Sequence, residues 1–562
     1  MSIIRRKAVL SGGFSMITKI VTSLEKVFLD SEPQSSPTRT FSGFANETIS
    51  FQLAYCQPLN GVRGGSFCGI EVESDIKDHV RMRRVVSVPV GLASFSGFDD
   101  DDYLRKEPGL YPDMLVDVNE CKLRALPDQW NSIWIDVEGA PAGEHTLTFK
   151  IAQPECEDAI EEVHVNVLNC DLPKQELIYT RWLHCDAIAQ YYHIGMWSET
   201  FWAYLEKFIA AAVRRGINAI LTPIHTPPLD TEVGGERMTS QLVDVYLTHG
   251  KYSFGFDRLR RFIDICKRCG VEYYEIAHLF TQWGAYCTPK IVVNVDGTLQ
   301  KLFGWHVSAT SKEYAEFLGE YLPALKNELK AQGVLERTIW HISDEPSFEH
   351  LESYKAAKAL VEPYIGDMYI LDALSDVRFY KTGAVEHPVP ANNHVHDFID
   401  EHVKGLWTYY CCGQGKDVSN QFIAMPSRRE RILGVQMYKY DIVGFLHWGY
   451  NFYNCQYSYY PIDPYGTTDG DGFVPAGDTF QVYPGKDGEA VESIRMMVFA
   501  ECIDDMRALK LLEQLTSREH VLKLIEEGCE SELTFYDYPR NDEYIIALRE
   551  KVNAEIMANL KK

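Results

Sequence analysis

The sequence lacks an excess of positive charge, and it lacks any long apolar run. Its 562 residues include 55 Lys and Arg against 80 Asp and Glu, which gives a formal net charge of −25. A nucleic-acid binder needs clustered cations to displace counterions from phosphates, and an anionic membrane surface selects cations as well. No run of about 18 apolar residues, the length that spans a bilayer, occurs in the chain. We therefore expect neither a nucleic acid nor a membrane as a partner.

Signals for secretion and for disulfides are also missing. Residues 1–16 carry a basic cluster at 5–7 with no long apolar segment after it, so they do not resemble a secretory signal peptide. The 14 cysteines are scattered, as at Cys121 and Cys156, and are not spaced as a disulfide framework. Scattered free cysteines suit a reducing compartment, so we expect a cytoplasmic protein.

Cofactor motifs are absent as well. The chain has no P-loop and no Gly-x-Gly-x-x-Gly fingerprint, which argues against a nucleotide cofactor. Its one Cys-x-x-Cys pair, Cys266 and Cys269, falls in an amphipathic helical stretch and has no second pair at zinc spacing. We interpret that pair as structural, and we expect no cofactor and no bound metal.

What the sequence does contain is apolar material for more than one core. Hydrophobic residues make up 46 % of it and aromatic residues 12 %, and its length predicts two or three domains. Up to about residue 170, apolar and polar residues alternate with a period of two, as in strands with one buried face. The runs are 49–55, 133–137, 147–151 and 163–167. Short strands without helices between them predict a β-sandwich over residues 1–170.

From about residue 176 the pattern changes to short apolar strands that alternate with helices of about 15 residues. The eight candidate strands are Tyr179–His184, Ile217–Thr222, Val271–His278, Thr338–Ile342, Met368–Asp372, Glu386–Pro390, Leu406–Cys411 and Val443–Trp448. One of the helices is predicted to begin with a cap at Thr310 and to end at Gly333. Eight such units predict a (β/α)8 TIM-type barrel over residues 176–515, with a short helical C-terminal extension over 516–562.

The residues that follow these strands are rich in rings and hydrogen-bonding groups, and the active site of such a barrel lies at the carboxyl ends of its strands. They are Trp182, His184 and Asp186 at strand one, His225 at strand two, His278, Gln282 and Trp283 at strand three, Trp407, Tyr409 and Tyr410 at strand seven, and Trp448 and Asn451 at strand eight. Aromatic rings stack on the C–H face of a pyranose, while amides, imidazoles and carboxylates bind its hydroxyls. The rim is thus predicted to bind a sugar, although any one ring could instead pack in the core. Alternation along the strand allows only one of Tyr409 and Tyr410 to face the pocket.

Asp344 and Glu345, at the end of the fourth strand, are the most specific signal for chemistry. Neighbouring side chains in a strand face opposite ways, but where the backbone turns both can reach one pocket. Pro346 keeps Glu345 out of the α region, which supports such a turn. Two carboxylates in one site can separate their pKa values. Adjacent carboxylates leave no room for the water of an inverting pair, and they suit a substrate-assisted route in which the sugar's 2-acetamido oxygen attacks C1.

Several motifs resemble the catalytic domain of glycoside hydrolase family 123 over about residues 179–515. They are His341-Ile-Ser-Asp-Glu-Pro346, Gly444-Phe-Leu-His-Trp-Gly-Tyr-Asn451, Thr222-Pro-Ile-His-Thr-Pro-Pro228, and Ser493-Ile-Arg495 with Glu501 to Asp505. The resemblance implies a retaining β-N-acetylgalactosaminidase in which Asp344 polarises the 2-acetamido group and Glu345 is the acid/base. It implies an oligosaccharide or glycoconjugate substrate. The C4 configuration of the sugar, the linkage and the aglycone stay open, so a β-N-acetylhexosaminidase of another specificity is an alternative.

Two other classes of function are compatible with parts of the sequence. A metal-dependent TIM-barrel hydrolase would place His-x-His after strand one, where this chain has His184-x-Asp186, and His394-Val-His396 is expected to open a helix after strand six. A non-catalytic carbohydrate-binding protein would keep the aromatic residues without needing Asp344 and Glu345. The acidic run Asp99–Asp102 fits either a calcium loop or a solvated loop.

Overall fold

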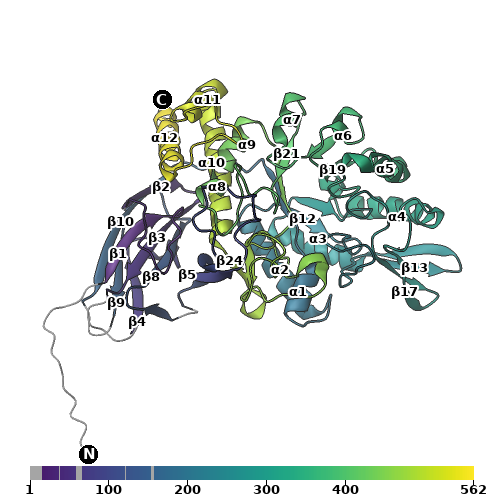
Figure 1. The fold of residues 1–562 in the computed structure, drawn as a ribbon, viewed down its shortest axis with the longest axis horizontal. Helices are drawn as coiled ribbons and strands as arrows, with labels where there is room; N and C mark the ends of the chain where they lie inside the picture. The colour runs from purple at the N-terminus through teal and green to yellow at the C-terminus, as the bar shows by residue number, and fades with distance from the viewer. Residues whose placement is uncertain (1–15, 37, 59–65, 120–121, 154–156, 562) are drawn as a thin grey trace, which may run out of the picture. The chain divides into compact units, whose positions relative to one another are not determined.

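The computed structural model describes residues 16–36, 38–58, 66–119, 122–153 and 157–561 (Figure 1). Cys121 and Cys156 lie outside the described residues, and the cysteines within them are all free. The chain divides into two compact units: Met1–Ser87, Leu110–Pro173 and Arg549–Lys562 form one, and Val88–Gly109 with Lys174–Leu548 form the other. None of the helices in the described part of the chain has the length and apolar character to cross a bilayer.

The first unit is the predicted β-sandwich. One sheet has the order β1 (Ile17–Thr22), β3 (Thr48–Cys56), β8 (Trp130–Glu138), β5 (Val80–Val90), β6 (Gly109–Asp117); the other has the order β2 (Thr40–Phe44), β10 (Ala159–Leu168), β9 (Gly143–Ala152), β4 (Ser66–Glu73), β7 (Leu123–Ala125). Phe51, Leu53, Ile135, Phe149 and Val165 belong to the apolar core of this unit. The four runs of alternating residues all became strands of the two sheets.

Strand β8 departs from the alternation because both of its faces are buried. Asp136 on this strand pairs with Arg83 and accepts hydrogen bonds from Trp134 Nε1 at 2.6 Å and from Ser50 Oγ at 2.8 Å. A buried carboxylate is tolerated when its oxygens are paired in this way. The strand can therefore carry polar residues without a solvent face.

The second unit holds the predicted (β/α)8 barrel. Its sheet has the order β20 (His387–Val389), β19 (Tyr369–Ala373), β18 (Thr338–Trp340), β15 (Tyr273–Ile276), β12 (Ala219–Thr222), β11 (Ile178–Arg181), β22 (Gly444–His447), β21 (Trp407–Tyr409). Every neighbouring pair is parallel, and a bridge between Ala391 and Tyr409 closes the ring. Each strand overlaps one of the eight predicted segments, in the predicted order; β11 begins one residue before its segment and β19 ends one residue after its own.

Helices connect and follow the barrel strands (Figure 1). They are α1 (Cys185–Tyr191), α2 (Glu199–Arg214), α3 (Asp257–Cys269), α4 (Lys312–Ala331), α5 (Leu351–Ile365), α6 (Arg378–Lys381), α7 (Val395–Asp400), α8 (Arg428–Arg431), α9 (Leu433–Lys439), α10 (Ile494–Leu515), α11 (Arg518–Glu526) and α12 (Asp542–Leu560). Short 3-10 turns lie at Lys77–His79, Leu335–Arg337, Phe348–His350, Gln456–Ser458 and Lys486–Gly488.

Helix α4 is capped by Ser311, which accepts from Tyr314 N, and not by the predicted Thr310. His394 does precede a helix, α7.

Small sheets that the sequence did not predict lie among the barrel loops. Strands β14 (Lys251–Gly255), β13 (Asp244–Thr248), β16 (Ile291–Val295) and β17 (Thr298–Phe303) form one sheet in that order, and β23 (Val482–Pro484) pairs with β24 (Ala490–Glu492). The first sheet is built from chain that follows β12 and β15, so it extends loops at the carboxyl ends of those strands.

The boundaries of the compact units differ from the predicted domain boundaries at residues 170, 176 and 515. Residues 88–109 group with the barrel unit, where Asp100 Oδ1 meets Arg429 Nη1 at 2.8 Å and Asp102 pairs with Arg428. Asp100 and Asp102 are thus paired with arginines of α8, whereas Asp99 pairs with Lys106 and Asp101 is exposed. At the other end, residues 549–562 group with the sandwich and not with a separate C-terminal extension.

Candidate active site

Asp344 and Glu345 lie just beyond the carboxyl end of β18, at the point where the backbone turns sharply. Glu345 has a φ of +44°, in the left-handed region that a residue with a side chain rarely adopts. The turn is held on both sides, because Trp283 N donates to Asp344 O at 2.8 Å and Glu345 N donates to Ala373 O at 2.9 Å. These bonds come from the loop after β15 and from β19. These two bonds therefore anchor the backbone of Asp344 and Glu345 to the segments on either side of β18.

Glu345 faces an open cavity. Its Oε1 accepts a hydrogen bond from the Tyr409 hydroxyl at 2.6 Å. Both residues line a cavity of about 850 Å³ together with Phe348, Asp376 and Arg378. Glu345 is exposed at this cavity, but the protein atoms around its carboxyl group exclude part of the solvent and raise its pKa above the ordinary value, and the Tyr409 hydroxyl partly offsets that rise. A carboxyl that holds its proton to higher pH beside an open cavity is suited to act as a general acid.

Asp344 has different surroundings although it is the next residue. Within the described part of the chain no side chain or backbone group donates a hydrogen bond to its carboxylate. Burial, and then the neighbouring charge of Glu345, raise the pKa of Asp344 well above its ordinary value, while His341 opposes the rise. The carboxylate is thus a hydrogen-bond acceptor left without a partner at the mouth of the barrel.

Below the pair, a charged network fills the barrel interior. His341 Nε2 lies 2.7 Å from Glu275 Oε1, and its Nδ1 lies 3.4 Å from Asp372 Oδ1. Burial disfavours a charged imidazole, but the bonds to Asp372 and Glu275 outweigh it and raise the pKa of His341 to about 10. The network is therefore a cation between two anions, three residues before Asp344 in the chain.

The network extends to neighbouring elements. Glu275 also accepts from Trp182 Nε1 at 2.8 Å and from the Thr180 hydroxyl, and Asp372 accepts from the Tyr354 hydroxyl at 2.5 Å and from Ile342 N at 2.9 Å. The bond to Ile342 N fixes the backbone two residues before Asp344. Trp182, predicted to bind sugar, is thus a buried part of this network.

Three of these residues bring metal-ligating atoms close together. In the described chain His278, His341 and Asp372 place one such atom each within 4.8 Å of one another. The two imidazoles are stacked, with centroids 4.3 Å apart and planes 21° apart, so their in-plane lone pairs do not converge on one point. Both nitrogens of His278 lack a hydrogen-bond partner among the described residues. The geometry fits a packed, charge-paired layer better than a metal centre.

Four of the predicted sugar-binding residues are joined through His184 and Arg237: His184, Asp186, Trp448 and Asn451. His184 N donates to Asn451 Oδ1 at 2.8 Å, and His184 Nε2 lies 2.8 Å from Trp448 O. Arg237 bonds to both oxygens of Asp186, at 2.9 and 2.7 Å, and reaches His184 Nδ1 at 3.0 Å. Burial, together with the Arg237 charge, lowers the pKa of His184 to about 3. The structure thus brings these residues together as a clamp between the loops after β11, β12 and β22.

Residues predicted from strands two, three and seven lie at different depths. His225 and His278 are buried, and His225 Nε2 lies 2.8 Å from His278 O. Trp407 is buried in the apolar core of the barrel, in the cluster that also holds Tyr409. Tyr410 points away from that cluster, because its hydroxyl lies 3.4 Å from both Arg181 Nη2 and Glu430 Oε1. Tyr409 is accordingly the tyrosine that faces the pocket.

Trp448 is the half-buried tryptophan of the rim, and it is held by a residue that the sequence analysis missed. Its Nε1 donates to Asp478 Oδ2 at 2.9 Å. Asp478 is buried, and this burial raises its pKa to about 7. Arg495 Nη1 holds the same loop through Gly477 O at 2.7 Å and Phe480 O at 2.8 Å. Asp478 lies in a loop without periodicity, so no pattern in the sequence pointed to it.

Comparison with known proteins agrees with this geometry. The family model described as "Glycoside hydrolase 123, catalytic domain" matches residues 182–512, more than half of the chain. The chain belongs to glycoside hydrolase family 123. The predicted membership, the enzyme class and the architecture of sandwich and barrel are confirmed, and the substrate of a glycoside hydrolase is a carbohydrate.

Solved structures give the same fold. A family 123 glycoside hydrolase from Clostridium perfringens, described in a study of glycolipid glycan hydrolysis, is similar with a TM-score of 0.71 and 12 % identity over 97 % of this chain and 98 % of that one. Two other solved structures are too distant to support an argument. A GH5 xyloglucanase from Bacteroides ovatus has a TM-score of 0.29 and 8 % identity over 83 % of this chain and 98 % of that one. A family 39 glycoside hydrolase from Bacteroides cellulosilyticus WH2 has a TM-score of 0.31 and 11 % identity over 83 % of this chain and 82 % of that one. Among curated proteins, none matches this sequence.

Proposed function

We propose that this family 123 enzyme removes a terminal β-linked N-acetylgalactosamine with retention of configuration, using the sugar's own 2-acetamido group as the nucleophile. The observation that carries the proposal is the contrast between two adjacent carboxyl groups. Glu345 bonds to Tyr409 and faces a cavity of about 850 Å³, whereas the Asp344 carboxylate has no donor among the described residues. One group is placed to exchange a proton with a substrate, and the other is placed to accept a hydrogen bond from it.

The reaction follows from these placements. Asp344 accepts the acetamido N–H, which orients the carbonyl oxygen toward C1 and stabilises the positive charge that develops on the group. Glu345 donates its proton to the glycosidic oxygen as the C1–O bond breaks and the carbonyl oxygen forms its bond to C1. Water then attacks C1 of the oxazolinium as the bond between C1 and the acetamido oxygen breaks, and Glu345 takes the proton from that water. Two inversions at C1 give net retention, and the acid/base returns to its starting state.

The buried network below acts on this assignment through the charge of His341. Asp344 must be ionised to act, yet burial, Glu345, Asp372 and Glu275 oppose its ionisation. The His341 cation, held between Glu275 and Asp372, is the charge that favours the ionised form. We regard His341 as a positioning residue, because it is set one layer below the site and its nitrogens are engaged by the two carboxylates.

The test is a panel of p-nitrophenyl β-glycosides of GalNAc, GlcNAc, Gal and Glc, with a thiazoline analogue of the bicyclic intermediate. We expect the enzyme to hydrolyse the GalNAc compound and to leave the Gal and Glc compounds, which have no acetamido group, nearly unchanged. The thiazoline should inhibit, because it mimics an intermediate that the site stabilises. A higher rate on the GlcNAc compound would favour the alternative β-N-acetylhexosaminidase specificity. Efficient hydrolysis of the β-galactoside would contradict the mechanism.

A further inference from the structure

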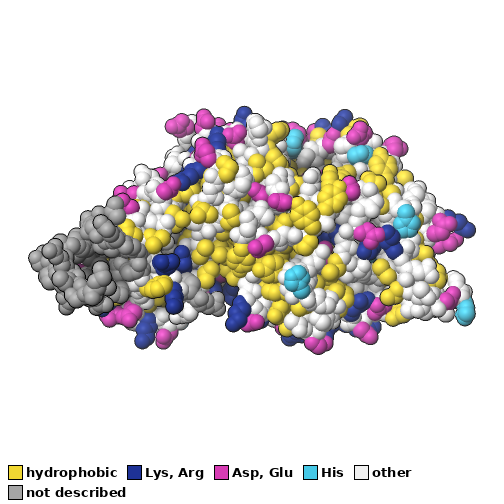
Figure 2. All heavy atoms as spheres, turned by 60° about the horizontal axis from the view of Figure 1, so that its bottom comes forward, with side chains coloured by type: hydrophobic (Ala, Val, Ile, Leu, Met, Phe, Trp, Pro, Cys, Tyr) yellow, Lys and Arg dark blue, Asp and Glu magenta, His cyan; other side chains and the backbone are white. Residues whose placement is uncertain are grey.

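Three aromatic side chains stand on the barrel rim beside Asp344, and none of them lines the cavity next to Glu345. Trp283 is 41 % exposed and Tyr459 is 59 % exposed. The ring of Tyr457 lies between them, 6.3 Å from Trp283 and 5.9 Å from Tyr459, edge to face with both. We call Trp283, Tyr457 and Tyr459 the aromatic ledge. Figure 2 shows one face of the molecule, on which hydrophobic side chains gather near the centre.

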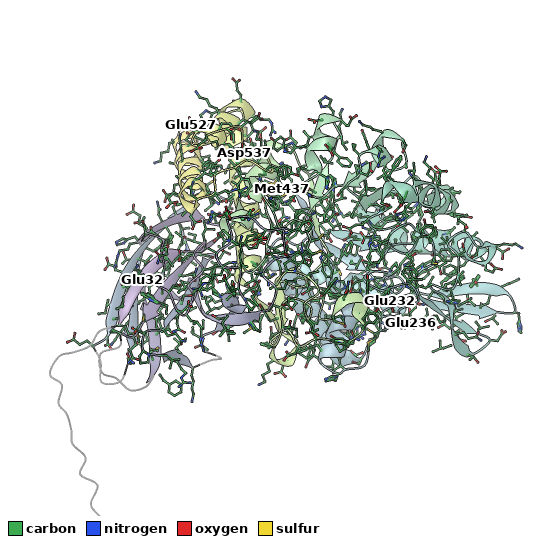
Figure 3. All side chains as sticks on the ribbon, in the orientation of Figure 1. Glu32, Glu232, Glu236, Met437, Glu527 and Asp537 are labelled. Atoms are coloured by element: carbon green, nitrogen blue, oxygen red, sulfur yellow. The ribbon has the colours of Figure 1, made fainter. Side chains whose placement is uncertain are left out.

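Specific contacts hold the ledge in place. Ser458 Oγ donates to Asp230 O at 3.0 Å, and Asp230 N donates to Gln282 Oε1 at 2.7 Å, so the loops after β22, β12 and β15 are tied together. The neighbouring carboxyl group of Glu232, labelled in Figure 3, raises the pKa of Tyr459 to about 12. Exposed rings on free loops would need no such bonds.

The backbone beneath the ledge is strained. Trp283 has a φ of +57°, Tyr457 of +56° and Ser458 of +57°, all in the left-handed region. Each such residue costs of order 1 kcal/mol or more and persists only where the surroundings enforce it. The exposed position of these rings therefore costs the fold some stability. Large exposed apolar groups of this kind mark a binding surface.

We propose that the aromatic ledge is a subsite for a sugar of the aglycone, which stacks the apolar C–H face of a pyranose on Trp283. The ledge is continuous with the catalytic pair, because Trp283 N bonds directly to Asp344 O. Tryptophan and tyrosine combine an apolar face with a polar edge, which suits a ligand whose rim of hydroxyls stays in water. The inference rests on the proposed function: an enzyme that removes a terminal sugar can bind further sugars only on the aglycone side.

The subsite would make the natural substrate an oligosaccharide, not a simple glycoside. Binding energy from parts of a substrate remote from the reacting bond can be used to orient the reacting group. An aglycone with two or more sugars would then raise kcat/KM above that of a compact glycoside with the same terminal sugar. Loss of the ledge would remove that advantage only.

The experiment compares two substrates and four proteins. The substrates are trifluoroethyl β-GalNAc, whose aglycone is too small to reach the ledge, and a tetrasaccharide that ends in β-GalNAc. The proteins are the wild type, Trp283→Ala, Trp283→Tyr and, as a matched control, Tyr246→Ala, which removes a ring of similar exposure (39 %) on β13. Trp283→Ala keeps the backbone N–H that donates to Asp344 O and removes only the ring. We therefore expect kcat/KM to fall about 10- to 100-fold on the tetrasaccharide and less than about twofold on the compact glycoside. Trp283→Tyr should keep most of the activity, and the control should behave as wild type.

A binding measurement separates this proposal from the proposed function. Calorimetry with the trisaccharide that lacks the terminal sugar should show binding to the wild type and about 10-fold or weaker binding to Trp283→Ala. If no 2-acetamido glycoside is hydrolysed but this binding difference is seen, the proposed function fails and the ledge stands. An equal loss of kcat/KM on both substrates, or no loss on either, would contradict the proposal that the aromatic ledge is a sugar subsite. So would a concentration-dependent dimer that Trp283→Ala abolishes, since the rings would then face a second copy of the chain.

Discussion

At the residue scale, the two candidate catalytic groups differ because of what lies around them and not because of where they lie in the chain. Asp344 and Glu345 share one sharp turn, but only Glu345 meets a hydroxyl donor, from Tyr409 at 2.6 Å. Interacting carboxyls titrate as a pair, and burial raises both pKa values here. We therefore expect activity to need one proton on the pair: it falls at low pH as the pair takes up a second proton and at high pH as the pair loses its last one.

The first prediction concerns Glu345→Gln. The amide cannot donate a proton as an acid does, so substrates with poor leaving groups should lose about 10²- to 10⁴-fold in rate. Activated aryl glycosides need little protonation and should lose less, and added azide should restore part of their turnover because it needs no general base. Steady-state rates on the two substrate types provide the measurement. Equal losses on both would show that Glu345 is not the acid/base.

The second prediction concerns Asp478→Asn and the pH dependence of stability. Burial raises the pKa of Asp478 to about 7, so the folded state keeps a proton that the unfolded chain releases at lower pH. Stability must therefore fall as pH rises from about 4 to about 7. The asparagine cannot ionise but still offers an oxygen to Trp448 Nε1. Between pH 5 and pH 8 the wild type should lose about 2 kcal/mol more unfolding free energy than the variant.

Urea unfolding of both proteins at the two pH values measures that difference directly. Because the comparison is between variants, effects of the large net charge are shared and cancel. Curves of stability against pH that run parallel for the wild type and Asp478→Asn would contradict the assignment of a near-neutral pKa to this carboxyl.

At the element scale, the site depends on helices that hold the loops behind it. Helix α10 begins at Ser493, which accepts from Met496 N at 3.2 Å, and it carries Arg495, which pins the loop of Asp478. Arg431 on α8 pairs with Asp505 at 2.7 Å and Glu501 at 2.8 Å, both on α10. Among the motif residues near 493–505, Arg495 thus supports Trp448 through the loop of Asp478, while Glu501 and Asp505 hold α10 against α8.

The third prediction tests the packing of α10 against α9. Gly434 on α9 approaches α10 so closely that an added Cβ would collide with the backbone carbonyl of Cys502. Backbone cannot rotate away as a side chain can, so Gly434→Ala should destabilise the enzyme by about 1–3 kcal/mol, although alanine favours a helix. Gly413→Ala is the control, because no atom lies within 4 Å of its added Cβ. Equal denaturation midpoints for the two variants would rule out the close helix contact.

Sequence periodicity predicted the strands of the barrel because most of them are short apolar runs. The predicted helices of about 15 residues are found in α2 to α5, whereas α6 and α7 have only 4 and 6 residues. The sheet of β13, β14, β16 and β17 was missed because its strands are partly exposed; most residues of β17, for example, face solvent. Thr310 and Ser311 are both good caps by composition, and only the backbone geometry selects Ser311.

The site was predictable where chemistry followed a strand. Asp344, Glu345, Tyr409 and Trp448 all lie at strand ends, where the barrel rule places function. Glu275 and Asp372 were missed because they lie inside strands, although a carboxylate within an apolar strand is itself a signal of a buried polar partner. The roles of His184 and Asp186 could not be read from the sequence, because their shared partner, Arg237, lies in the loop after β12. Asn451 bonds to the backbone of His184.

At the scale of the whole molecule, the compact units are not contiguous in the chain. Residues 88–109 and 549–562 each group with a unit that their place in the sequence does not suggest. The signal for the first is charge pairing of Asp100 and Asp102 with Arg429 and Arg428, which is a long-range property that local patterns do not contain. The likeness to the Clostridium perfringens enzyme covers 97 % of the chain, so this architecture is common to both proteins.

The central claim is that the substrate's own acetamido oxygen is the nucleophile, and one series of substrates tests it most directly. Aryl β-GalNAc glycosides that carry N-acetyl, N-fluoroacetyl, N-difluoroacetyl and N-trifluoroacetyl groups differ little in size but greatly in the nucleophilicity of the carbonyl oxygen. Our account predicts that kcat/KM falls steeply and steadily with each added fluorine, because the developing oxazolinium is destabilised in the transition state. A rate that does not change along the series would show that an enzyme carboxylate or water attacks C1, and it would contradict the account.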